Sequence, residues 1–251
     1  MRVRIPSALA LFAALVSSAL LSPALHARDE PARLREARKR SEPAIRARFA
    51  AAGVAWPARA MLLRAFKLDD ALELWAGDKP GAPLELVHTF RVCARSGRPG
   101  PKRRGGDGQV PEGFYEVSGL NPWSSFHLSL RVSYPNRSDR LRGRAGDLGN
   151  DIFIHGNCVT IGCLPLEDGP VEELYVAVND ARAAGAKVEA HLFPARLDED
   201  GQKRLEPWAK KDPALRGFWE ELRPGFEAFE KTRAAPLVTV AKDGRYLIRA
   251  R

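Results

Sequence analysis

The stretch IFIHGNCVTIGCL, residues 152–164, joins a short apolar run to a histidine and two cysteines. The run 151–154 is typical of a buried strand, and His155 closes it. Cys163 follows directly after Gly162. A thiol is only slightly ionised at neutral pH, so a nucleophilic cysteine needs a neighbour that accepts its proton. An imidazole can do so because its pKa lies near neutral pH, and the stretch therefore indicates a cysteine–histidine catalytic pair.

Other interpretations of this stretch stay open on spacing alone. His155 can be a structural residue at the end of a strand. Cys158 and Cys163 can form a disulfide, which an oxidising compartment favours. His155 and both cysteines can instead hold zinc with a fourth ligand from elsewhere in the chain. If the stretch is catalytic, Gly162 leaves the backbone open, so its N–H and that of Cys163 can face a substrate carbonyl as an oxyanion hole.

Short apolar segments around this stretch predict a domain built mainly from strands. The predicted strands span 61–66, 71–75, 84–90, 114–117, 127–132, 151–154, 187–193, 236–240 and 245–248. One helix is predicted to begin at Pro170 and to end before Gly185, and another spans 215–232 with a bend at Pro224. The predicted fold class is therefore mainly β (α+β), with flanking helices.

The sequence of the N-terminal region predicts a targeting signal followed by a helix. Residues 1–27 combine two arginines and no acid with an apolar run at 8–21, which is typical of a secretory signal peptide cleaved near Ala27. An uncleaved anchor is the alternative, although the run is shorter than the roughly 20 residues that a membrane span needs. Residues 28–58, rich in Arg, Glu and Ala, predict an exposed helical lead-in interrupted at Pro43. No later segment is apolar enough to predict a membrane span.

Length, net charge and apolar content limit the kinds of binding partner that the chain is expected to have. The chain has 251 residues, a formal net charge of +9 and 45% hydrophobic residues. Its length suits one domain of moderate size, and its apolar content excludes wholesale disorder. Basic charge on an exported protein either serves solubility or indicates a polyanionic partner such as the cell wall. Nucleic acid is not expected as a partner, because no basic motif interleaved with aromatic residues occurs.

The segment 95–113 predicts a long loop, because glycine and proline are too frequent in it for regular structure. Its cations are Arg95, Arg98, Lys102, Arg103 and Arg104. Such a loop can hold the carboxylates of an acidic peptide, or it can be a solvated, mobile connection.

His155-Gly156, followed by Thr160 and the Gly162-Cys163 pair, resembles the active-site signature of the L,D-transpeptidase family, with its YkuD-like catalytic domain. Further motifs resemble the YafK-type branch of that family, and together they cover roughly residues 60–240. These motifs are Ser96-Gly97, Gly100-Pro101-Lys102, Gly106-Asp107-Gly108, Pro111 to Tyr115, Asn121-Pro122, His127-Leu128-Ser129, Tyr134-Pro135-Asn136 and Phe218-Trp219.

The resemblance implies a catalytic domain over residues 59–251, with an L,D-transpeptidase-like β-sandwich or barrel and a C-terminal helix. It implies that Cys163 is the nucleophile, that His155 is its base and that Gly162 contributes to the oxyanion hole. The residues that it implies for substrate binding are Thr160, His127, Lys102 and Gly156. It implies no cofactor and no metal. In the common family signature a second histidine precedes the Gly-Cys pair, whereas this chain has Ile161 there.

The function that the resemblance implies is acyl transfer in the periplasm. Cys163 would attack peptidoglycan stem peptides at the L-centre of diaminopimelate and form a thioester, which passes to an amine or to water. The branch includes enzymes that release a wall-linked outer-membrane lipoprotein, which makes such a lipoprotein an expected partner. A non-catalytic peptidoglycan-binding module on the same fold is the alternative. If Cys163 is a free thiol, the other two cysteines, Cys93 and Cys158, are expected to pair.

Overall fold

A computed structural model describes residues 30–251, so the predicted signal peptide and its cleavage near Ala27 lie outside the described residues. Pro31–Arg251 forms one compact unit. Its helices are α1 (Ala32–Ala51), α2 (Arg137–Arg142), α3 (Asp168–Ala183), α4 (Glu199–Lys211) and α5 (Pro213–Thr232), with a 3₁₀ turn, η1, at Lys67–Asp69. Its strands are β1 (Ala60–Phe66), β2 (Ala71–Gly77), β3 (Glu85–Arg91), β4 (Gly113–Asn121), β5 (Ser129–Val132), β6 (Ile152–His155), β7 (Leu164–Pro165), β8 (Val188–Phe193), β9 (Leu237–Val240) and β10 (Tyr246–Arg249).

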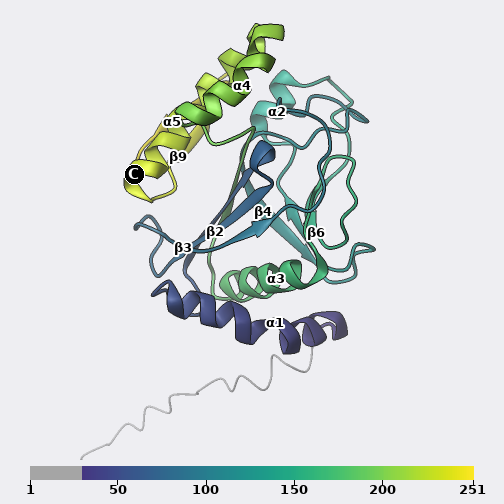
Figure 1. Cartoon of the computed structure of the whole chain (residues 1–251), viewed down its shortest axis with the longest axis vertical. Coiled ribbons are helices and arrows are strands. Elements are labelled where there is room, and N and C mark those ends of the chain that lie inside the picture. The colour runs from purple at the N-terminus through teal and green to yellow at the C-terminus, as the bar shows by residue number, and fades with distance from the viewer. Residues whose placement is uncertain (1–29) are drawn as a thin grey trace, which may run out of the picture. The chain divides into compact units, whose positions relative to one another are not determined.

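Strands β1 to β8 form one curved sheet in the order β3-β2-β1-β8-β4-β5-β6-β7, and β9 and β10 form a separate hairpin (Figure 1). The pairs β1–β8 and β6–β7 are parallel, whereas the other neighbours in the sheet are antiparallel. The predicted fold class, mainly β (α+β) with flanking helices, is confirmed, and each predicted strand overlaps one in the structure.

Helices cover the sheet from both sides, and the side chains of β1 alternate between two cores. Leu63 and Ala65 join the core that α1 and α3 complete. Phe66 joins the core formed with α4 and α5, and the buried Arg64 guanidinium stacks on Phe226 of α5 at 5.0 Å from the ring centroid. Because both faces are covered, β1 and β2 are buried along nearly their whole length.

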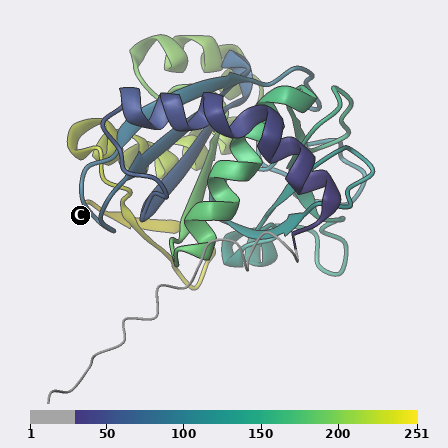
Figure 2. The same ribbon diagram turned by 90° about the horizontal axis from the view of Figure 1, so that it is seen from below.

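Helix α1 differs from the predicted lead-in, because it continues through Pro43 and buries one face. Ile45 and Phe49 are fully buried in the main core. Arg38 forms an ion pair with Asp180 of α3 at 2.7 Å. The packing of α1 across α3 (Figure 2) compensates for the backbone hydrogen bond that Pro43 cannot donate.

Helices α2 and α4 were absent from the sequence-based expectations. Helix α4 begins at an Asp198 cap, whose side chain accepts a hydrogen bond from the Gly201 N–H at 2.9 Å, and it contains Pro207, which obscures its helical pattern. Between residues 30 and 251, no helix has both the length and the apolar character that crossing a bilayer requires.

Candidate active site

His155 is the last residue of β6, and Cys163 is the residue directly before β7, the strand that pairs with β6. The parallel register pairs Ile154 with Leu164, so Cys163 lies opposite Phe153. The Phe153 N–H donates to the Cys163 sulfur at 3.4 Å. Ile154 and Leu164 point into the main core. Since side chains alternate along a strand, His155 and Cys163 extend from the opposite face of the sheet, as a catalytic pair requires.

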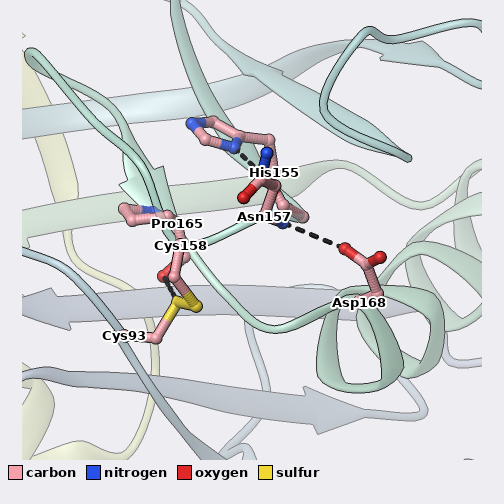
Figure 3. Close-up of a disulfide and its surroundings, with 7 residues drawn as sticks. Cys93, His155, Asn157, Cys158, Pro165 and Asp168 are labelled. Carbon is pink, nitrogen blue, oxygen red and sulfur yellow. Dashed lines mark hydrogen bonds between the residues drawn. A yellow bond between two sulfur atoms is a disulfide. The ribbon is translucent and has the colours of Figure 1, made fainter.

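His155 is buried and held by its neighbours. Its Nδ1 lies 2.6 Å from the Gly156 carbonyl oxygen (Figure 3), and its ring packs on Phe126 at a centroid distance of 4.8 Å. Burial lowers the pKa of His155, although the hydrogen bond to Gly156 opposes this shift. The imidazole is therefore neutral at neutral pH. With Nδ1–H donating to the carbonyl, Nε2 is left as the acceptor, which is the tautomer that a general base needs.

Gly156 allows this arrangement because a side chain would not fit there. A Cβ atom at Gly156 would lie 2.5 Å from a carboxylate oxygen of Asp168 and 2.9 Å from the Cβ of His127. The same Asp168 carboxylate accepts the Asn157 N–H at 3.0 Å (Figure 3). Gly156, expected to bind substrate, is placed by the structure where its carbonyl orients His155.

Cys163 is a partly buried free thiol. Burial raises the pKa of Cys163, while the Phe153 N–H and the charge of Lys102 act in the opposite direction without reversing the shift. The thiol is therefore protonated at neutral pH. Among the described residues no hydrogen bond joins its sulfur to His155, a geometry that is common when substrate is absent. Cys163 is thus a neutral thiol and His155 a neutral imidazole on the same face of the sheet, and reaction requires transfer of the thiol proton.

The predicted oxyanion hole is occupied by the chain itself. The N–H groups of Gly162 and Cys163 converge on one oxygen, the Thr160 hydroxyl, at 3.1 and 2.8 Å. That hydroxyl donates to the Cys163 carbonyl at 2.8 Å. Thr160, expected to bind substrate, therefore closes the turn before the nucleophile. Gly162 has a φ of 143°, a conformation that favours glycine, and Ile161 beside it is 90% exposed.

Cys163 and Leu164 open onto a pocket of about 220 Å³. Its far wall is the segment 92–99, and Trp208 of α4 closes one side. Most of its lining is apolar, which excludes water and strengthens electrostatic effects at the sulfur. Residues 95–99 and Val110 of the predicted loop 95–113 therefore form part of the wall of this pocket.

A disulfide joins Cys93 in that wall to Cys158 in the segment between His155 and Cys163 (Figure 3). The expected pairing of Cys93 with Cys158 is confirmed, and the alternative disulfide between Cys158 and Cys163 is wrong. The zinc site considered above would need Cys158 as a ligand, and Cys158 is already bonded in this disulfide. Within residues 30–251, no group of three or more His, Cys, Asp or Glu side chains is arranged to hold a metal ion.

Lys102 and His127, both expected to bind substrate, are engaged by other residues. The buried Lys102 ammonium binds Asp107 at 2.7 Å and the Arg104 carbonyl at 2.9 Å, so it contributes charge near Cys163 but is not free for a ligand. His127 Nε2 lies 2.7 Å from Glu172 of α3.

Phe126 packs on His155, Asp168 binds the Asn157 N–H and Glu172 binds His127, and sequence reasoning missed all three. Their partners lie far away along the chain, as in the 45-residue separation between His127 and Glu172. The local signal available was the pair of acids at the start of α3, Asp168 and Glu172, which lie one helical turn apart.

The chain is 35% identical, over 189 residues, to an Escherichia coli K12 protein named "Putative L,D-transpeptidase YafK", and the match covers 74% of this chain and 72% of that protein. Among solved structures it is similar to the helical cell shape determining protein Pgp2 from Campylobacter jejuni, with 16% identity, 78% of this chain and 80% of that chain covered, and a TM-score of 0.45. It is also similar to L,D-transpeptidase 1 of Mycobacterium tuberculosis, with 12% identity, 53% and 62% covered, and a TM-score of 0.29. No family model matches the chain.

Proposed function

The chain belongs to the L,D-transpeptidase family, in its YafK-type branch, and from that premise we propose that it is an exported cysteine acyl-transfer enzyme acting on peptidoglycan stem peptides. The observation that carries the proposal is the placement of Cys163. It is a free thiol at the edge of an apolar pocket, on the same face of the sheet as a neutral, oriented His155.

The proposed reaction runs through a thioester. The Cys163 sulfur bonds to the carbonyl carbon at the L-centre of diaminopimelate while His155 Nε2 takes the thiol proton. His155 then returns this proton to the leaving amine as the C–N bond breaks. Water or an amine then attacks the thioester while His155 Nε2 takes its proton. The C–S bond breaks, and His155 returns that proton to the Cys163 sulfur, which restores the free thiol. The N–H groups of Gly162 and Cys163 can stabilise the tetrahedral oxygen only after the Thr160 hydroxyl turns away from them.

We favour water as the acceptor, which would make the reaction hydrolytic release of a wall-linked outer-membrane lipoprotein. This part of the proposal rests on family membership, and it requires that residues 1–27 direct the chain to the periplasm. The disulfide between Cys93 and Cys158 supports an oxidising compartment.

Product analysis tests the proposal. Purified protein is incubated with defined muropeptides, with and without an attached lipoprotein-derived lysine peptide, and the products are identified by mass. We expect wild-type protein to cleave the lysine link, and we expect Cys163→Ala and His155→Gln to lose this activity by roughly a hundredfold or more.

The same experiment separates the enzyme from a binding module. Both variants should still bind wall sacculi, because neither substitution closes the pocket. Wild-type protein that binds sacculi but leaves every muropeptide unchanged would favour the non-catalytic alternative.

A further inference from the structure

A second groove adjoins the Cys163 pocket on the other side of residues 97–99. Its volume is about 660 Å³. The charged residues that line it are Arg98, Arg103, Arg104, Arg142, Asp107 and Asp212. Gly97, Arg98 and Pro99 line both the groove and the pocket. One extended ligand can therefore occupy the two cavities at once.

Both acids in the groove are already engaged by the protein. Asp107 binds Lys102 and accepts the N–H groups of Arg103 and Arg104. Asp212 caps the N-terminus of α5 by accepting the Ala214 N–H at 3.1 Å. Neither carboxylate forms an ion pair with an arginine that lines the groove, and the four arginines outnumber the two aspartates, so the lining keeps a positive net charge.

Two of the arginines are engaged in part, and two are free. Arg103 lies 3.5 Å from Asp139, and Arg142 binds Glu221 at 2.7 Å. The side chains of Arg98 and Arg104 are exposed and make no ion pair with any residue in the described range 30–251. Two unpaired guanidinium groups in one groove match the planar geometry of carboxylates.

The ridge that carries Arg98 is held in place by backbone contacts. The Arg98 N–H donates to the Gln109 side chain at 2.7 Å. The Gly100 N–H donates to the fully buried Glu112 at 2.7 Å. A fixed backbone reduces the entropy that binding costs. The groove is therefore organised before a ligand arrives.

We propose that this groove binds a carboxylate-bearing segment of the peptide whose acyl group is delivered to Cys163, with Arg98 and Arg104 as the contacts that select for negative charge. The proposal rests on the proposed function, since it takes the ligand from that reaction. It assigns the groove to the acidic donor peptide and not to the lysine segment that leaves, because a cationic lysine would be repelled by the same arginines.

The test compares two muropeptide tetrapeptides, one with free carboxylates and one with those carboxylates amidated. Their binding to Cys163→Ser protein is measured by calorimetry at low and moderate salt. The Arg98→Gln/Arg104→Gln double variant should bind the free-acid peptide about tenfold more weakly and the amidated peptide unchanged. Arg249→Gln, which removes an exposed arginine from β10, is the matched control and should change neither.

Equal affinity of the double variant and its parent for the free-acid peptide would overturn the proposal. An Arg98→Lys/Arg104→Lys variant keeps the charge but loses the planar donors, and we expect it to be intermediate. If wild-type protein forms product but the arginine substitutions leave peptide binding unchanged, the result would contradict the proposal for the groove and leave the proposed function standing. If the arginine substitutions weaken peptide binding but wild-type protein forms no product, the result would contradict the proposed function. The affinity of the groove for carboxylates would still be supported.

Discussion

Two irregular segments meet at the Cys163 pocket, and they are held in different ways. Residues 156–163 are held by the disulfide at Cys158, by the hydroxyl of Thr160 and by the contact of Asn157 with Asp168. Residues 95–113 are held mainly by charged and amide side chains, including the Lys102–Asp107 pair. The first segment carries the nucleophile and the second carries the pocket wall.

This difference shows that the two segments should respond to different perturbations. A disulfide and short hydrogen bonds make residues 156–163 less sensitive to salt, whereas ion pairs make residues 95–113 sensitive to charge. Lys67 of η1 adds to these contacts, because its nearly buried ammonium donates to the carbonyls of Gly100 and Val110 in the second segment. The disulfide also joins the first segment to the pocket wall at Cys93, so its removal should affect both.

Removing the disulfide should have the largest effect. The crosslink closes a loop with a sequence separation of 65 residues. Replacing Cys93 and Cys158 together by serine should lower the free energy of unfolding by about 4 kcal/mol, because the unfolded chain regains the entropy of that loop. Denaturant unfolding measures the loss, and Cys163→Ser is the control that should leave the midpoint in place. An unchanged midpoint in the double variant would contradict this account of the segment.

Asp107→Ala should have the next largest effect. It leaves the buried Lys102 ammonium unpaired and should destabilise the protein by about 3 kcal/mol. Burial raises the pKa of Asp107, but the contacts with Lys102 and three backbone N–H groups outweigh it, so the pKa is lowered overall.

The pH dependence of the Asp107 effect has a definite sign. A lowered folded-state pKa gives stability that is present above the unfolded pKa and is lost as pH falls through the folded pKa. The difference in the free energy of unfolding between wild type and Asp107→Ala, measured by denaturant unfolding, should therefore become smaller below about pH 4. A gap that stays constant down to pH 2 would show that the charge on Asp107 contributes nothing.

Gly156→Ala tests how closely the first segment is packed around His155. The added methyl group would overlap the Asp168 carboxylate and crowd His127, and we expect a loss of about 2 kcal/mol in stability together with lower activity. Gly169→Ala in α3 is the matched control, because its Cβ would meet no atom within 4 Å. The thermal unfolding midpoints of the two variants are compared, and the midpoint of Gly156→Ala should be the lower one. Equal midpoints would mean that position 156 tolerates a side chain.

Thr160→Val removes the acceptor on which the Gly162 and Cys163 N–H groups converge. Stability should fall by about 1 kcal/mol, while Thr160→Ser should restore it. Since the same N–H groups are the proposed oxyanion donors, kcat and KM should be measured separately for both variants. A valine variant with wild-type stability and wild-type kcat would show that this turn does not position the nucleophile.

The smallest expected effect is a shift in the pH profile. Burial lowers the pKa of His155 and raises that of Cys163. The active form has both groups neutral, so kcat/KM should rise with pH along a limb whose midpoint lies below the ordinary histidine value of about 6.5. Alkylation of Cys163 by iodoacetamide should keep increasing above pH 8. Alkylation that is already maximal at pH 6 would indicate a preformed thiolate–imidazolium pair and contradict this assignment.

The same contrast explains what the sequence could predict. The apolar run predicted the strand that His155 ends, so a local pattern was enough to locate this residue. The two-residue strand β7 after Cys163 and its pairing with β6 were not predicted, because two residues carry no periodic pattern. The contacts of Lys102 with Asp107 and of His127 with Glu172 depend on how the fold brings these side chains together, so the sequence did not predict these partners. The role of Thr160 was missed because its backbone partners depend on the turn that it closes. Pro43 was misread because packing on α3, rather than local propensity, stabilises α1.

Locating the acyl group on the enzyme tests the role of Cys163 most directly. Wild-type protein is mixed with a tetrapeptide-containing muropeptide, quenched in acid and analysed by intact mass and peptide mapping. We expect one acyl group, on the peptide that contains Cys163, and we expect hydroxylamine to remove it. Continued product formation after iodoacetamide has fully alkylated Cys163, or an acyl group on any other residue, would contradict its assignment as the nucleophile.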